Sequence, residues 1–242
     1  IINENPNLSN ILVIDCGIKN SQLRSLLRHN VQLTIVNTNY HFIDEVLNNK
    51  YAGIFLSNGP GNPTSSTLVV EQLKKAFQSN INVPIFGICY GHQLIGLASG
   101  CDIKKMKYGN RGHNIPSNLI GTQKCYITSQ NHGYEVILDK INPINEWQEL
   151  FVNSNDGSNE GLIHPTKPFF SVQFHPEARA GPTDTKFLFD IFIERTKSDF
   201  NIKDKIYDIV NNSLKDTISY VEDVKNNIKK ILILGSGGLS IG

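Results

Sequence analysis

Short apolar runs alternate with amphipathic segments over the first hundred residues of the chain. Four of these runs lack polar alternation, which is typical of strands buried on both faces of a parallel sheet. They predict strands at residues 11–14, 33–36, 53–56 and 84–87. The segments between them repeat apolar residues every three or four positions, which predicts helices. These helices are expected at residues 21–29, 67–78 and 91–99. The pattern therefore predicts an α/β fold, with a mostly parallel central sheet flanked by helices.

Beyond residue 101 the pattern changes to short apolar runs separated by turns. Strands are expected there at residues 125–129, 149–153, 161–163 and 170–173. A helix is expected over residues 183–195. A longer apolar stripe at steps of three and four then predicts an amphipathic helix over residues 198–228. We expect this C-terminal helix to be a linker that docks on a neighbouring domain.

The predicted domain organisation has four parts. Residues 11–197 form the main domain and residues 198–228 the linker helix, after an N-terminal extension at residues 1–10. Residues 229–242 predict a strand and a glycine-rich turn. A single strand cannot bury itself, so we expect this segment to be the truncated start of a second domain.

Composition narrows the class of protein. Of the 242 residues, 39% are hydrophobic, which is enough for a sizeable core, and 23 basic against 22 acidic residues give a net charge of +1. No nucleic-acid or membrane partner is expected from this balance, and a small substrate is favoured. The four cysteines form no Cys-x-x-Cys pair, so we expect no metal site and no disulfide framework, but reduced thiols in a cytoplasmic protein.

The sharpest local motif is Gly-Ile-Cys-Tyr-Gly at residues 87–91. A residue on a tight strand-to-helix turn adopts a strained backbone, and the flanking glycines leave room for it, as in the nucleophile elbow of hydrolases. The helix N-terminus that follows Cys89 favours the thiolate form. A buried structural cysteine fits the same turn, so the motif alone leaves both interpretations open.

A cysteine nucleophile needs a base, and the base needs an orienting group. His175 follows a predicted strand, and Glu177 lies two residues later, within reach of its imidazole. His92 and His132 are the competing candidates for the base. Developing negative charge on the substrate also needs donors, and the backbone amides of Gly59 and Tyr90 are the candidates, because Pro60 has no N–H.

Together these motifs resemble the class I, triad-type glutamine amidotransferases, whose fold is flavodoxin-like. Within that family, three further segments resemble the glutaminase domain of a fused, eukaryotic-type carbamoyl-phosphate synthase. They are KMKYGNRGHNIP at residues 105–116, QNHGY at 130–134 and HPEARAGPTD at 175–184. The tail at residues 229–242 resembles the first residues of the synthetase part.

The resemblance implies a role for each candidate residue. Cys89 would attack the carboxamide of L-glutamine, with His175 as the base and Glu177 as its orienting group. The amides of Gly59 and Tyr90 would hold the oxyanion. The positions that match the glutamine-binding residues of the family are Gly61, Gln93, Asn131, Gly133 and Tyr134.

The resemblance also implies a partner. The ammonia released would pass to a synthetase domain of the same chain, which uses ATP and Mg²⁺ to make carbamoyl phosphate from bicarbonate, the first step of de novo pyrimidine biosynthesis. No cofactor is implied for residues 1–242. In the family, a small N-terminal domain precedes the glutaminase part and supplies a serine to its site. We expect residues 1–242 not to include this domain.

Three alternatives remain. A related amidotransferase could feed anthranilate, GMP or CTP synthesis, although residues 130–134 and the tail argue against it. A non-catalytic docking module would be favoured by the loss of Cys89, His175 or Glu177, yet all three are present. A Cys–His hydrolase of the same elbow geometry would need neither the glycines at 59 and 61 nor a synthetase tail.

Overall fold

The computed structural model describes residues 1–138, 146–179 and 181–212. The chain divides into two compact units, residues 1–206 and 207–242. The first unit holds one nine-stranded sheet. Its elements, in chain order, are β1 (Asn10–Asp15), α1 (Asn20–Leu27), β2 (Gln32–Asn37), α2 (Ile43–Leu47), β3 (Gly53–Leu56), the 3-10 turn η1 (Pro63–Ser65), α3 (Thr67–Gln78), β4 (Ile85–Ile88), α4 (Tyr90–Ser99), β5 (Asp102–Leu119), β6 (Cys125–Ile137), β7 (Gln148–Asn153), β8 (Asn159–Ile163), β9 (Phe169–Val172) and α5 (Phe187–Arg195).

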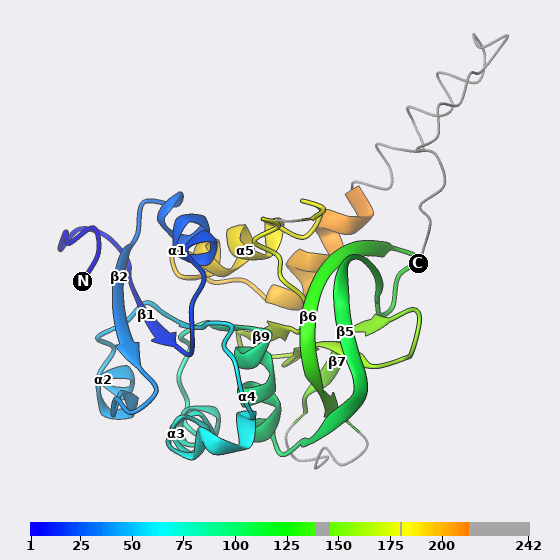
Figure 1. Ribbon diagram of the computed structural model, residues 1–242. Coiled ribbons are helices and arrows are strands. Elements are labelled where there is room, and N and C mark those ends of the chain that lie inside the picture. The colour runs from blue at the N-terminus through cyan, green and yellow to red at the C-terminus, as the bar shows by residue number, and fades with distance from the viewer. Residues whose placement is uncertain (139–145, 180, 213–242) are drawn as a thin grey trace, which may run out of the picture. The chain divides into compact units, whose positions relative to one another are not determined.

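The sheet has a parallel half and an antiparallel half, in the order β2-β1-β3-β4-β9-β8-β7-β5-β6. The pairings from β2 to β9 are parallel. Those from β9 to β6 are antiparallel. Helices α1 and α5 lie on one face of the parallel half, and α2, α3 and α4 lie on the other (Figure 1). The predicted α/β fold is confirmed, and the sheet continues beyond its parallel part as a set of antiparallel strands.

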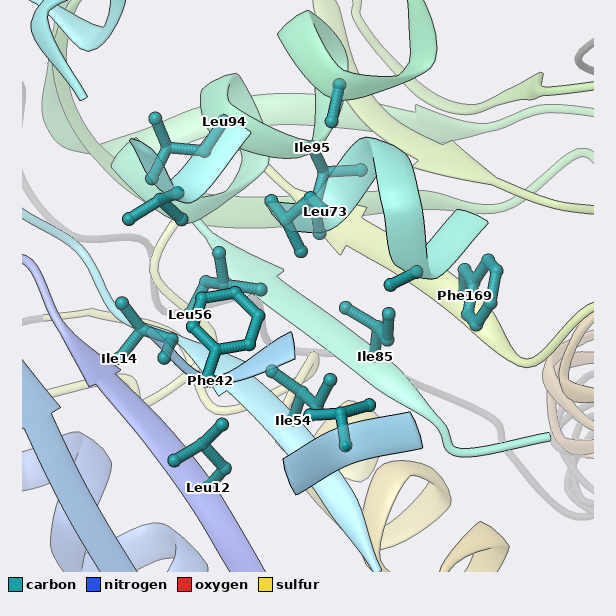
Figure 2. Close-up of a cluster of buried hydrophobic side chains, with 14 of the residues drawn as sticks. Leu12, Ile14, Phe42, Ile54, Leu56, Leu73, Ile85, Leu94, Ile95 and Phe169 are labelled. Carbon is teal, nitrogen blue, oxygen red and sulfur yellow. The ribbon is translucent and has the colours of Figure 1, made fainter. Parts of the chain in front are cut away.

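The parallel strands lack polar alternation because both of their faces are covered. Leu12 and Leu56 point into the cluster formed with α2, α3 and α4 (Figure 2). On the opposite face, the rings of Phe55 and Phe86 pack against Phe192 of α5 with centroid separations of 6.2 and 5.7 Å. Burying each such side chain contributes roughly 1.5–3 kcal/mol. This two-sided burial holds the carboxyl ends of β1, β3, β4 and β9 at one edge of the sheet.

Several boundaries differ from the predicted ones. The segment expected to hold short strands begins with an 18-residue strand, β5, paired with the 13-residue β6. Two register shifts in β5 and a positive φ at Gly109 interrupt the alternation that would have revealed its length. Helix α2 was not predicted, and α5 begins at Phe187 rather than residue 183.

The C-terminal predictions are only partly within the described residues. Residues 202–212 are helical, which covers the first part of the predicted linker helix. The remainder of that helix and the strand expected at residues 229–242 lie outside the described residues. Over the ranges that the structure describes, no helix is long and apolar enough to cross a membrane.

Candidate active site

Cys89 occupies a strained turn between β4 and α4. Its backbone has φ 55° and ψ −100°, outside the regions that L-residues ordinarily adopt. The turn is fixed by the neighbouring β9, because the Cys89 amide donates to Val172 O at 2.8 Å. Glycine is required beside it: a Cβ on Gly91 would lie 2.3 Å from Leu56 O. The side chain thus projects from the edge of the sheet at the N-terminus of a helix, as a nucleophile elbow requires.

His175 and Glu177 follow β9, the strand next to β4. His175 Nδ1 lies 2.9 Å from Glu177 Oε1, and both side chains are almost fully buried. This contact leaves Nε2 as the ring atom available to Cys89, and Nε2 has no hydrogen-bond partner among the described residues. Burial lowers the pKa of His175, but the adjacent Cys89 and Glu177 outweigh burial and raise it to about 9. The imidazole is therefore held as a strong base between the thiol and the carboxylate.

Lys19 is a charged neighbour of this pair that the sequence analysis missed. Its Nζ lies 3.5 Å from Glu177 Oε1 and 3.3 Å from His175 Nδ1. Burial raises the pKa of Glu177, yet the contacts with His175 and Lys19 bring it below its usual range. The available signal was position, because Lys19 follows β1 at the same sheet edge as Cys89. Its ammonium group helps to keep the carboxylate ionised.

A pocket of about 590 Å³ opens in front of Cys89. It is lined by Lys19, Asn58, Gly59, Pro60, Gly61, Asn62, Cys89, Gln93, Lys105, Arg111, Asn131, His132, Gly133, Tyr134 and His175. Eight of the predicted site residues therefore meet at one cavity. Glu177 lies behind His175 rather than in the wall. Tyr90 does not line the cavity either, and its hydroxyl lies 2.9 Å from the Ser66 hydroxyl.

The loop at residues 57–61 is pressed against the end of β1. A Cβ on Gly59 would lie 2.0 Å from Cys16 O, so only glycine fits there. Ser57 holds the two segments together, because its hydroxyl accepts from the Cys16 amide at 2.9 Å. The N-terminus of α4 is tied in as well, since the Gly91 amide donates to Ser57 O at 3.1 Å. Gly59 and Cys89 are thereby fixed on the same pocket wall.

Residues of α4 and β6 also line the pocket. Gln93 Nε2 donates to Tyr134 O at 3.1 Å, which joins the helix to the strand. The Cys89 Sγ lies 3.9 Å from Asn131 O. Lys105 and Arg111 of β5 also line the pocket, within a motif to which the sequence analysis gave no role. With Lys19, they supply three cationic side chains, which suits a small substrate that carries a carboxylate.

The two competing histidines have structural contacts. His92 is fully buried, its Nδ1 lies 2.9 Å from the Ser171 hydroxyl, and burial with nearby His132 lowers its pKa to about 3. His132 lines the pocket, but its ring nitrogens face Tyr134 O at 2.9 Å and Gln130 Oε1 at 3.0 Å. The pKa of His132 is lowered to about 4, mainly by burial. His175 is thus the histidine placed for proton transfer with Cys89.

Replacing Glu177 by glutamine is expected to slow the reaction of Cys89. The change removes the carboxylate charge that raises the pKa of His175, so that pKa should fall below 9. We expect Cys89 alkylation by iodoacetamide to become at least about tenfold slower at pH 7.5. The measurement is the alkylation rate from pH 6 to 10, and Glu194→Gln on the exposed side of α5 is the control. A rate profile superimposable on that of the unaltered protein would contradict the assigned role.

Comparison with known proteins agrees with this geometry. Residues 12–195 match the family described as Glutamine amidotransferase class-I. The chain is 48% identical over 233 residues to "Multifunctional protein ura1" of Schizosaccharomyces pombe, covering 96% of this chain and 10% of that protein. It is 52% identical over 184 residues to "Carbamoyl phosphate synthase arginine-specific small chain" of Debaryomyces hansenii, covering 76% of this chain and 42% of that protein. The chain therefore spans about a tenth of the multifunctional relative and less than half of the small chain.

Solved structures support the fold. A protein from Thermoplasma acidophilum, assigned to a GMP synthase, superposes with a TM-score of 0.64 at 24% identity, covering 80% of this chain and 96% of that one. A glutamine amidotransferase from Thermotoga maritima superposes with a TM-score of 0.55 at 15% identity, covering 80% and 87%. With the family match over most of the domain, these findings lead to one conclusion: the chain belongs to the class I glutamine amidotransferase family.

Proposed function

We propose that this chain is the glutaminase region of a glutamine-dependent carbamoyl-phosphate synthase. The observation that carries the proposal is the strained Cys89 elbow beside the His175–Glu177 pair, with Cys89 and His175 both at a pocket lined by the expected glutamine-binding residues. Relatives named as a carbamoyl phosphate synthase small chain and as multifunctional proteins support the assignment.

In the first half of the reaction, Cys89 Sγ forms a bond with the side-chain carbonyl carbon of L-glutamine. His175 Nε2 takes the thiol proton, and the Glu177 carboxylate, which Lys19 helps to keep ionised, stabilises the imidazolium. The amides of Gly59 and Tyr90 hold the oxyanion of the tetrahedral intermediate. When this intermediate collapses, the C–N bond breaks, and His175 returns the proton to the leaving nitrogen. The products are ammonia and a γ-glutamyl thioester on Cys89.

In the second half, His175 takes a proton from water, and the hydroxide oxygen bonds to the thioester carbon. The C–S bond then breaks, glutamate leaves, and the proton returns to Cys89. Gly61, Gln93, Asn131, Gly133 and Tyr134 bind and orient glutamine during both steps.

The ammonia is handed to a synthetase domain of the same polypeptide. That domain uses ATP and Mg²⁺ to join ammonia to bicarbonate, and no residue of this chain is assigned to either cofactor. Fusion to a synthetase fits the pyrimidine pathway, and the four free cysteines fit a cytoplasmic location.

The test is covalent labelling by a glutamine-like electrophile, with the adduct located by mass spectrometry. Labelling is preferred to turnover because it reports a formed site even when the cycle is slow. We expect a single adduct on Cys89 that excess L-glutamine suppresses and that Cys89→Ser lacks. Equal labelling of Cys16, Cys101 and Cys125 would contradict the proposal, as would labelling of Cys89 that glutamine leaves unchanged.

A further inference from the structure

A buried polar network lies behind the pocket wall, and Glu160 of β8 is at its centre. Glu160 is 0% exposed, which is rare for a carboxyl group. Its Oε1 accepts a hydrogen bond from Asn153 Nδ2 at 3.0 Å. Gln130 of β6 is a neighbour of the Glu160 carboxyl group, and Asn153 and Gln130 are both buried as well. None of these three residues has a part in the chemistry described above.

One branch of the network leads to the glutamine pocket through β6. The Thr128 hydroxyl donates to Ile115 O at 2.8 Å, and so it accepts from Gln130 Nε2 at 3.1 Å. Gln130 is thereby oriented with its Oε1 toward His132 Nε2, 3.0 Å away. A neutral His132 has one ring proton to share between Gln130 and Tyr134 O. The position of the Gln130 side chain therefore affects the pocket strand directly.

A second branch leads toward α4. Glu160 lies opposite Gln173 across the β8–β9 pair, where the Gln173 amide donates to Glu160 O at 2.9 Å. Directly opposed residues in an antiparallel pair have side chains on the same face. The Gln173 side chain accepts from Gln93 Nε2 at 3.0 Å, and Gln93 lines the pocket. Gln173 Nε2 and Glu160 Oε2 are both buried and lack a hydrogen-bond partner within the described ranges.

We propose that Glu160 is a positioning residue for the glutamine pocket, which acts through Gln173 on Gln93 and, through the Gln93–Tyr134 hydrogen bond, on the strand segment 131–134. This inference rests on the proposed function, since glutamine is taken as the ligand. Glu160 touches no substrate. Its buried carboxyl group sets the orientation of the side chains that hold the pocket wall in place.

The protonation state of Glu160 gives the proposal a measurable signature. Burial, with a smaller contribution from the charge of Asp156, raises its pKa to about 8. The facing charged or titratable groups are Asp156 from the β7–β8 turn and, beyond Gln130, His132 of β6. At neutral pH Glu160 is therefore an uncharged acid. Ionisation above pH 8 places a charge in the buried network, so we expect glutamine to bind more weakly there.

The experiment measures how well L-glutamine protects Cys89 from alkylation by iodoacetamide, at pH 7 and pH 9. Glu160→Leu should raise the half-protecting glutamine concentration at least about tenfold, while the alkylation rate without glutamine stays within about twofold. Glu160→Gln keeps the shape and hydrogen bonds, so it should restore wild-type protection at pH 7. It should also lack the weakening of protection between pH 7 and pH 9.

The matched control is Glu149→Leu. Glu149 is a half-buried carboxylate in the adjacent strand, and it accepts from Asn159 Nδ2 at 2.9 Å. Among the residues that the structure describes, it is not one of those that line the pocket. Equal weakening by Glu149→Leu and Glu160→Leu would overturn the proposal, because any loss of a buried carboxylate would then suffice. If Glu160→Leu does not fold, the comparison of Glu160→Gln with the wild type decides. The proposal is overturned if glutamine protects Cys89 of Glu160→Gln less well at pH 9 than at pH 7, by as much as in the wild type.

A measurement made without glutamine distinguishes failure of this proposal from failure of the proposed function. If glutamine gives no protection of the wild-type protein, the proposed function fails. Hydrogen exchange of the amides at residues 131–134 then tests Glu160 by itself. Exchange at least about fivefold faster in Glu160→Leu than in Glu149→Leu supports the positioning role, and equal exchange overturns it.

Discussion

Replacing Cys89 by alanine is expected to lower glutamine hydrolysis at least about 1000-fold, because it removes the atom that forms the thioester. His175 cannot compensate: its Nε2 is the base, and no other thiol lines the pocket as described. Glutamine binding should survive, since Gln93 and the segment 131–134 are unchanged. The measurement is steady-state release of glutamate at saturating glutamine, together with the affinity for glutamine by calorimetry.

The control for this prediction is Cys125→Ala. Cys125 is an exposed thiol at the start of β6, away from the pocket lining, and its removal should leave hydrolysis within about twofold. Hydrolysis by Cys89→Ala at a tenth or more of the wild-type rate would show that the thioester mechanism is wrong for this chain. A water activated directly by His175 would then be the better account.

Replacing Gly59 by alanine is expected to reduce both activity and stability. The added Cβ would lie 2.0 Å from Cys16 O and 2.9 Å from Cys16 Cβ, and Cys16 directly follows β1, which is held by pairing with β2 and β3. We expect the free energy of unfolding to fall by about 1–3 kcal/mol. Moving the loop also displaces an oxyanion donor, so kcat should fall about 100- to 1000-fold. Urea unfolding and glutamate release give the two quantities.

Gly157→Ala is the control for Gly59→Ala, because it adds backbone strain at a positive φ without steric overlap. Gly157 has φ 74°, and a Cβ added there would have no other atom within 4 Å, so alanine should cost only about 1 kcal/mol of stability and no activity. If folded Gly59→Ala hydrolysed glutamine within tenfold of the wild type, the assignment of its amide to the oxyanion would be refuted.

Much of the parallel half could be predicted from the sequence, because two-sided burial leaves continuous apolar runs. The strand expected at residues 53–56 and the helix expected at 67–78 match β3 and α3 at both ends. The antiparallel half was harder to predict. Most of β5 is exposed or half-buried, and its bulges interrupt the period of two.

The candidate site divides in a similar way. Cys89, His175 and Gly59 could be predicted from the sequence, because a nucleophile, its base and an oxyanion donor each lie in a short local motif. The structure brings all three to one cavity. Lys19 belongs to no such motif, and only the adjacency of β1, β3, β4 and β9 brings it to His175. The role of Glu160 could not be predicted from the sequence, because no pattern around it indicates burial. A glutamate in a strand is expected to face solvent, and only the packing of β6, β7 and β8 shows that it is buried.

The two halves of the sheet carry different parts of the function: the parallel half holds the reacting groups, and the antiparallel half holds most of the expected substrate-binding residues. The nucleophile and its base stand at the ends of neighbouring parallel strands, β4 and β9, whose separation is fixed by main-chain hydrogen bonds. Three of the residues expected to bind the substrate, Asn131, Gly133 and Tyr134, lie in β6 of the β5–β6 hairpin, whose pairing carries two register shifts. A changed hairpin could thus accept a different amide while the reaction is kept, provided that Ser129 O of β6 still accepts from the His175 amide. Grafting hairpins between relatives is accordingly an engineering route to a new specificity that leaves β4 and β9 in place.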